Sequence, residues 1–290
     1  MKHANDRNRW PWLVTGIFFT TVGALSIHVA MLQVMNVPFP DLSVLTPLAR
    51  WLIRVTQIVG LMVFWQLAAP LPSAAFIKRW ALLFLIVCML TESLFRGPFM
   101  GGYCTGAYAY AFIGNVQALL TLAFISVLVV AVSTWSLQGW RRAIAAFAIA
   151  TLTMFAATPL VSAAMSPVMK SIAALAPQGE WCALPYGAKV LIPAYVTFLE
   201  PTLACVAVAG LVWDRLSPSF GLRLMQFSLI ILAIKTQLLM PFLYAALARQ
   251  PFLHALASEG QFALEALSLA ILAGMSWEYG CARMRRVPIS

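Results

Sequence analysis

The chain has 290 residues, of which 62% are hydrophobic and 10% charged, with a mean hydropathy of +0.88. These values exclude a soluble enzyme, a disordered chain and a small disulfide scaffold, because too few polar residues remain to cover a water-facing globule. The net charge of +10 does not indicate nucleic acid as a partner, because the basic residues stand at the ends of apolar runs, where they orient membrane helices.

Eight apolar runs predict transmembrane helices. A helix needs about 20 mainly apolar residues to span a bilayer, and suitable runs cover residues 12–35, 47–69, 79–95, 107–135, 143–165, 190–213, 222–247 and 261–279. The first run is too long for the core of a signal peptide and has no convincing cleavage site, so we interpret it as a retained helix. The sequence therefore predicts an all-α fold, a polytopic bundle of eight helices that forms one transmembrane domain over residues 1–290.

Lysine and arginine predict the orientation of this bundle. With a cytoplasmic N-terminus, the inner segments hold twelve of the 19 basic residues, namely Lys2, Arg7, Arg9, Lys78, Arg79, Arg141, Arg142, Arg215, Arg223, Arg283, Arg285 and Arg286. This is the excess of positive charge expected on the cytoplasmic side. We therefore expect both termini to be cytoplasmic and the chain to lie in a bacterial-type inner membrane, with the lipid bilayer as a partner.

Short similarities suggest a possible duplication of residues 1–140 in residues 141–290. The first predicted helix ends in AMLQVM and the fifth in AMSPVM. The second and sixth helices each close with a tryptophan that is followed five residues later by proline (Trp65 and Pro70; Trp213 and Pro218). Four helices in each half correspond to parallel repeats related by an axis along the membrane normal.

Charged residues inside the predicted helices are the candidate substrate-binding residues, because an ionisable side chain within a bilayer is costly and usually functional. They are Arg54, Glu92, Arg96, Glu200, Lys235 and Glu265. Glu92 and Arg96 stand four residues apart, which permits an ion pair on one helix face. We expect Glu200 and Lys235 to form a buried pair between the sixth and seventh helices. The alternative is that such pairs only neutralise each other and set the helix register.

The cysteines predict one disulfide. Cys104 and Cys182 are the only cysteines in predicted outer loops, whereas Cys88 and Cys205 fall within the membrane. An oxidising exterior favours a bond between the two outer residues. The five cysteines and three histidines follow no metal-binding spacing, so we expect no metal and no cofactor.

Residues 91–97, with the sequence TESLFRG, resemble the first motif of the CAAX-type glutamate intramembrane endopeptidases. Glu92, Phe95, Arg96 and Gly97 match that motif, and the resemblance implies a catalytic role for Glu92. Thr91 replaces the first glutamate of the family, and no histidine follows in the fourth or fifth predicted helix. The chain therefore lacks the carboxylate and histidine pair that would activate water.

In length and predicted number of spans, the chain is similar to the exosortase-type transpeptidases. That family carries cysteine, arginine and histidine at the outer ends of successive helices, and Cys182, Arg249 and His254 occur here in that order. The resemblance implies a thiol nucleophile at Cys182, with a pKa lowered by Arg249 and His254. Here the family's C-[SA]-G motif reads CAL, and its N-x-x-R motif is absent.

The charged cluster favours a transporter or permease-like protein that handles a small polar or anionic solute in an outward-facing cavity. We expect the arginines to contact the anion, and Glu200 with Lys235 to act as a gate or a proton-coupled pair. One alternative is an outward-facing membrane enzyme that uses Cys182 or Glu92. Another is a non-catalytic subunit that binds other membrane subunits.

Overall fold

The computed structural model describes residues 9–68, 75–133 and 139–282. Within these segments every regular element is helical and no strand occurs. Six helices are long and apolar enough to cross a membrane, namely Pro11–Gln33, Pro47–Leu67, Tyr108–Ser133, Trp140–Ser171, Ala188–Arg215 and Phe252–Gly280. The prediction of a helical, multi-pass membrane bundle is confirmed.

Two of the predicted spans are not continuous helices. The third divides into α4 (Phe76–Leu90) and α5 (Arg96–Thr105), and the seventh divides into α11 (Phe220–Ile234) and α12 (Met240–Leu247). Hydropathy reports which residues suit the bilayer, but it does not report whether the main-chain hydrogen bonds continue, so the sequence pattern missed both breaks. These breaks, at residues 91–95 and 235–239, build the site described below.

The other six predicted spans correspond to helices of the structure, four of them to single helices and two to helices with a local irregularity. The first, second, fourth and eighth predicted spans correspond to α2 (Arg9–Gln33), α3 (Pro47–Leu67), α6 (Tyr108–Ser133) and α13 (Phe252–Trp277). Thr46 caps α3, because its hydroxyl accepts from the N–H of Ala49 at 3.2 Å, and Pro47 is suited to the first turn. The fifth span runs through α7 (Trp140–Leu152), a π-helical turn and α8 (Thr158–Ser171), and the sixth bends between α9 (Ala188–Thr197) and α10 (Leu199–Val212).

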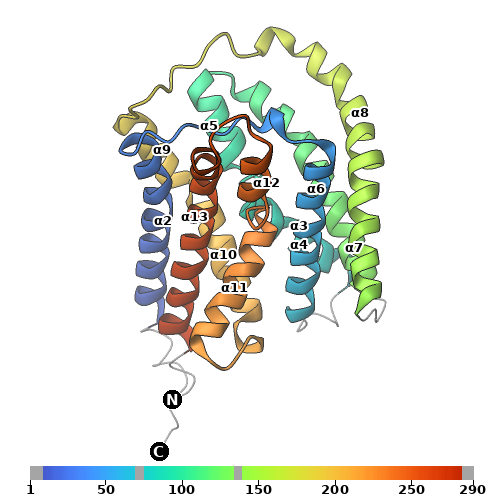
Figure 1. The fold of residues 1–290 in the computed structure, drawn as a ribbon, viewed down its shortest axis with the longest axis vertical. Helices are drawn as coiled ribbons and strands as arrows, with labels where there is room; N and C mark the ends of the chain where they lie inside the picture. Colours follow the sequence, from blue (N-terminus) through green and yellow to red (C-terminus); the bar gives the residue numbers. More distant parts are fainter. Residues whose placement is uncertain (1–8, 69–74, 134–138, 283–290) are drawn as a thin grey trace, which may run out of the picture.

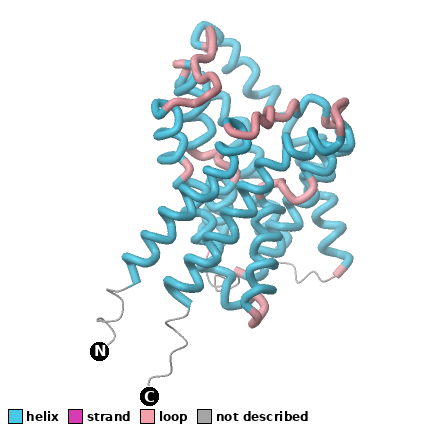
Figure 2. The backbone as a smooth tube through the Cα atoms, turned by 60° about the vertical axis from the view of Figure 1, so that its left-hand side comes forward, coloured by secondary structure: helices cyan, strands magenta, loops and turns pink. Residues whose placement is uncertain are grey.

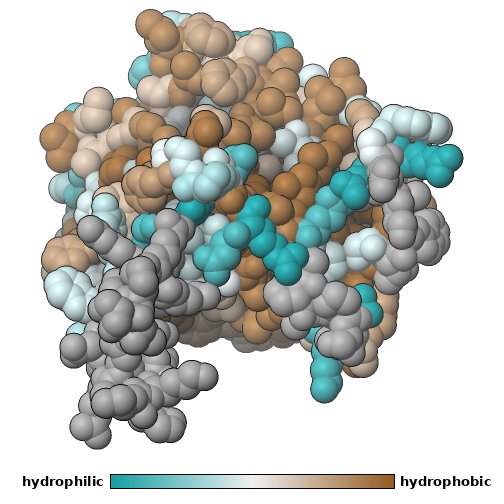
Figure 3. Space-filling view, turned by 90° about the horizontal axis from the view of Figure 1, so that it is seen from below, coloured by the Kyte–Doolittle hydropathy of each residue, from teal (hydrophilic) through white to brown (hydrophobic). Residues whose placement is uncertain are grey.

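The helices connect two faces of the molecule (Figures 1 and 2). The described beginning of α2 and the described end of α13 lie at one face, which we call the terminal face. Helices α5 and α12 and the segment 172–187 lie at the opposite face, which we call the loop face. Figure 3 shows hydrophilic side chains gathered on the terminal face among apolar ones. Several predictions concern residues that the structure does not describe. They are the placement of the two termini, the basic residues 2, 7, 283, 285 and 286, and Pro70.

Close helix packing holds the bundle together. Helix α2 packs along α13, and α3 packs on α11 beside the second break. A Cβ atom on Gly60 would lie only 2.7 Å from the Cβ atom of Ala233, so glycine is what lets α3 approach α11 there. Small residues at such contacts are typical of membrane helix bundles. The tight contact brings the polar side of α3 to the break in the seventh span.

Candidate functional site

The two helix breaks have the same backbone geometry. Helix α4 is followed by Glu92 with a φ of 59°, and α11 is followed by Thr236 with a φ of 65°. At each break the next N–H reaches back to a carbonyl five residues earlier, with pairs Ser93 to Cys88 and Gln237 to Leu232, both at 2.8 Å. This is a Schellman ending, which ordinarily places glycine in the left-handed position. A side chain there is strained, and such strain clusters at functional sites.

Side chains from neighbouring helices satisfy the freed backbone groups. The carboxylate of Glu200 on α10 accepts from three consecutive N–H groups at the start of α5, those of Leu94 at 3.1 Å, Phe95 at 3.0 Å and Arg96 at 2.5 Å. A carboxylate in that position also complements the positive end of the helix dipole. At the other break, the side-chain amide of Gln57 on α3 donates to the carbonyl of Ile234 at 2.9 Å.

Polar contacts from α6 and α13 complete the two breaks. The amide nitrogen of Asn115 on α6 donates to the carbonyl of Ser93. On the other side, the amide of Gln237 donates to Glu259 on α13 at 3.3 Å. Glu259 is only 2% exposed. The sequence alone does not identify Asn115 and Glu259 as partners of the breaks, because the apolar runs that contain the breaks look continuous.

An ion pair joins the two breaks. The ammonium of Lys235 lies 2.6 Å from one carboxylate oxygen of Glu92 and donates to the carbonyl of Leu90 at 3.0 Å. The other oxygen of Glu92 accepts from the guanidinium of Arg96 at 2.6 Å. Glu92 thus stands between two cations.

The expected pair of Glu200 with Lys235 is wrong. The break in the third span turns Glu92 toward Lys235, as the ion pair requires. Glu200 is held instead by the N–H groups at the start of α5. Lys235 could be neutralised by either Glu200 or Glu92, because both lie at a similar depth. The break in the helix places Glu92 beside Lys235, so this pair forms. Glu200 therefore stabilises the beginning of α5 and does not line the central cavity or the two pockets described below.

A cavity of about 360 Å³, which we call the central cavity, lies between the breaks. Four of the six candidate substrate-binding residues line it, namely Arg54, Glu92, Lys235 and Glu265. Uncharged polar side chains complete much of its wall (Gln57, Thr91, Ser93, Thr236 and Gln237). The volume falls in the range of small-molecule sites in proteins.

Two charged residues of the central cavity have no ionic partner within the described segments. Arg54 donates to the side-chain carbonyl of Gln57 at 2.5 Å and has no carboxylate partner there. Glu265 is 4% exposed and makes no hydrogen bond or ion pair with the described residues. In contrast to Glu92, these two groups remain available to a polar solute.

Two pockets extend from the central cavity toward the loop face. One, of about 300 Å³, shares Glu92 with it and reaches past Arg96 to Cys104 and Cys182, which form a disulfide. The other, of about 540 Å³, shares Arg54 and Thr236 with it and is lined by Arg50. The charged residues thus continue from the cavity toward the loop face on two sides.

The first of these pockets also contains two groups from the segment 172–187. Burial and the nearby carboxylate of Glu180 raise the pKa of Tyr186 above its ordinary value. Glu180 and Tyr186 both line the pocket. The disulfide ties this segment to α5, and the N–H of Trp181 adds a bond to the carbonyl of Cys104 at 3.0 Å.

The described residues contain no group of three or more histidine, cysteine, aspartate or glutamate side chains that could hold a metal ion. In comparisons with known proteins, no family model, curated protein or solved structure matches the chain.

Proposed function

We propose that the chain is a transporter or permease-like protein that moves a small polar or anionic solute through the central cavity. The observation that carries this proposal is the meeting of two broken helices at a cavity lined by Arg54, Glu92, Lys235 and Glu265. Broken helices at charged cavities are typical of solute sites in membrane transporters, because the freed backbone groups and the helix ends bind polar groups. Arg54 is the proposed anion contact, since it is held only by a neutral amide among the described residues.

We also propose an internal duplication of the chain, which would fit this function. The two breaks occupy equivalent positions in the sequence. Glu92 and Thr236 are the left-handed residues, and Ser93 and Gln237, which follow them directly, make the equivalent main-chain bonds. The spacing in sequence from Ser93 to Gln237 equals the spacing from Asn115 to Glu259, the side chains that bond to Ser93 and Gln237. The repeated break, with a polar side chain that bonds to it at the equivalent position, favours two related halves, 1–140 and 141–290.

The packing of the helices favours the same two halves. Helix α2 contacts α13 as α8 contacts α6, and α3 contacts α11 as α10 contacts α4. Exchanging the two halves therefore reproduces these pairs of neighbouring helices. In transporters built from parallel repeats, rocking of one half against the other exposes a shared site to each side in turn. The pair of Glu92 and Lys235 joins the halves, and we assign it the role of a gate.

We further propose that the chain makes eight crossings, with α4 and α5 together forming one and α11 and α12 another. The basic residues at the beginnings of α4 and α7 (Lys78, Arg79, Arg141 and Arg142) favour a cytoplasmic terminal face. The disulfide between Cys104 and Cys182 favours an exterior loop face, because such bonds persist in oxidising compartments. The inner membrane of a bacterial-type cell fits this orientation.

The enzyme alternatives have less support. In its disulfide, Cys182 offers no free thiol for the transpeptidase-like reaction. Both carboxylate oxygens of Glu92 are engaged by cations, so neither is free to activate water.

Flux into proteoliposomes tests the transport proposal. The full chain is reconstituted and supplied with a panel of small labelled anions and neutral polar solutes, and Arg54→Gln is compared with the original chain. We expect Arg54→Gln to lower anion flux at subsaturating solute by about tenfold, as for loss of one hydrogen bond to a charged group. Lys170→Gln removes an exposed charge at the end of α8 and should leave the flux unchanged. The proposal fails if no solute moves, or if Arg54→Gln and Lys170→Gln behave alike.

A further inference from the structure

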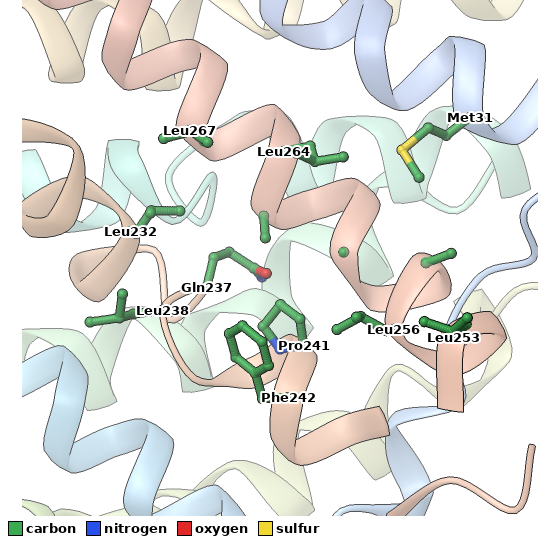
Figure 4. A pocket seen from close by; sticks show the side chains of 13 residues that line it. Met31, Leu232, Gln237, Leu238, Pro241, Phe242, Leu253, Leu256, Leu264 and Leu267 are labelled. Atoms are coloured by element: carbon green, nitrogen blue, oxygen red, sulfur yellow. The ribbon is translucent and has the colours of Figure 1, made fainter. Parts of the chain in front are cut away.

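A separate cavity, of about 490 Å³, is lined mainly by apolar side chains, and we call it the lateral groove (Figure 4). Helices α2, α11, α12 and α13 form it, with Met31, Leu232, Phe242 and Leu264 among its lining residues. Gln237 contributes the one polar side chain in this lining. The apolar walls exclude a polar solute from the groove itself.

The lateral groove opens toward the surface that faces the lipid. Three of its lining side chains are strongly exposed, with exposed fractions of 77% for Leu253, 60% for Phe242 and 45% for Leu264. These residues belong to α12 and α13, in the half of the bundle near the loop face. An apolar chain can therefore enter from the bilayer without crossing water.

Gln237 joins the lateral groove to the central cavity, because its side chain lines both. Its amide nitrogen is used by Glu259, but its carbonyl oxygen is buried and has no hydrogen-bond partner. Such a buried, unsatisfied oxygen is costly. In Figure 4 the amide end of Gln237 points into the groove. A ligand with a donor group at the junction would satisfy that oxygen.

We propose that the ligand of this protein is an anionic lipid of the surrounding bilayer. Its acyl chain lies in the lateral groove, and its head group passes Gln237 into the central cavity, where Arg54 binds the anion. This inference deepens the proposed transport function, because it names the solute class and uses the same cavity. A head group in a polar cavity with its chain beside the lipid is the arrangement that moving a lipid between leaflets requires.

Photolabelling in nanodiscs tests this inference. The full chain is placed in phosphatidylcholine nanodiscs that contain a trace of phosphatidylglycerol with a diazirine at the end of one acyl chain. A parallel sample contains phosphatidylcholine with the same labelled chain, and labelled peptides from residues 238–267 are quantified by mass spectrometry. We expect the anionic probe to label this region about tenfold more than the zwitterionic one, the effect of one charge-assisted contact.

Two variants and a matched control distinguish binding of the acyl chain in the lateral groove from binding of the head group in the central cavity. A Cβ atom on Gly260 would meet nothing within 4 Å, so Gly260→Leu fills the groove without a backbone clash and should abolish labelling by both probes. Gly221→Leu places the same side chain at an equally open position on α11, outside the groove, and should change nothing. Arg54→Gln should remove the preference for the anionic probe while labelling by the zwitterionic probe persists.

Equal labelling by the two probes in the original chain would overturn the inference, because the groove would then hold any lipid without reference to the cavity. Unchanged labelling in Gly260→Leu would overturn it as well. Flux measurements distinguish this failure from failure of the transport proposal. If small soluble anions move and Gly260→Leu leaves their flux intact while the probes label equally, transport stands and the lipid assignment falls. If the anionic probe is preferred but no soluble anion moves, the lipid assignment stands.

Discussion

The ammonium of Lys235 lies 2.6 Å from the carboxylate of Glu92, so each of the two broken spans supplies one member of an ion pair. Lys235 also donates to the carbonyl of Leu90 at the end of α4. One side chain therefore neutralises the carboxylate of Glu92 and caps α4, a helix distant from it in sequence. This contact couples the geometry of the two breaks.

Removing both members of this pair should cost less than the two single removals added together. Lys235→Met leaves Glu92 with a single cation and leaves the carbonyl of Leu90 unsatisfied, so we expect a loss of about 2–3 kcal/mol in the free energy of unfolding. The double variant Glu92→Gln with Lys235→Met leaves no carboxylate that has lost its lysine, although Arg96 then lacks its anionic partner, and it should lose less than the sum of the single variants. Unfolding of all four proteins in mixed micelles measures the coupling. Additive losses would contradict the role of the pair.

Glycine should be tolerated, and even stabilising, at the second break. Thr236 has a φ of 65°, a conformation that glycine adopts without the strain of a side chain. Thr236→Gly should raise the free energy of unfolding by up to about 1 kcal/mol. Thr56→Gly, within the regular helix α3, should lower it by a similar amount. The same sign of change in both variants would show that the left-handed position is not strained.

Loss of the carboxylate at position 200 should loosen the beginning of α5. Glutamine has one acceptor oxygen, so Glu200→Gln leaves at least one of the three N–H groups at residues 94–96 without its present partner. We expect hydrogen exchange of these amides to accelerate by about tenfold. Glu180→Gln, at an exposed position in the segment 172–187, is the matched control. Unchanged exchange at residues 94–96 would mean that Glu200 does not cap the helix.

Thiol labelling of intact cells checks both the disulfide and the orientation. Cys104 and Cys182 are bonded to each other, whereas Cys88 and Cys205 are buried. A membrane-impermeant reagent should therefore modify Cys104 and Cys182 only after reduction, and it should leave Cys88 and Cys205 unmodified. Immediate labelling of Cys182 would instead support a free thiol and revive the enzyme alternative. Labelling of neither residue after reduction would place the loop face in the cytoplasm.

Much of the candidate site was visible in the sequence. A charge within an apolar run is recognisable without a structure, and Arg54, Glu92, Lys235 and Glu265 were all found in that way. The partners of these charges were harder to infer. Matching depth suggested Glu200 for Lys235, but depth alone does not state which face of a helix a residue occupies once the helix is interrupted.

The sequence by itself determined the class of this protein, because composition and run length decide whether a chain can be covered by water or by lipid. It also determined which charged residues lie within the spans. Only the tertiary structure decided where the helices break. The left-handed position at such a helix end is usually glycine or asparagine, so glutamate at position 92 and threonine at position 236 do not predict it. The breaks are stabilised by contacts with Gln57, Asn115 and Glu200, which are distant in sequence. A local pattern cannot report such contacts, and they are what bring the charges to one cavity.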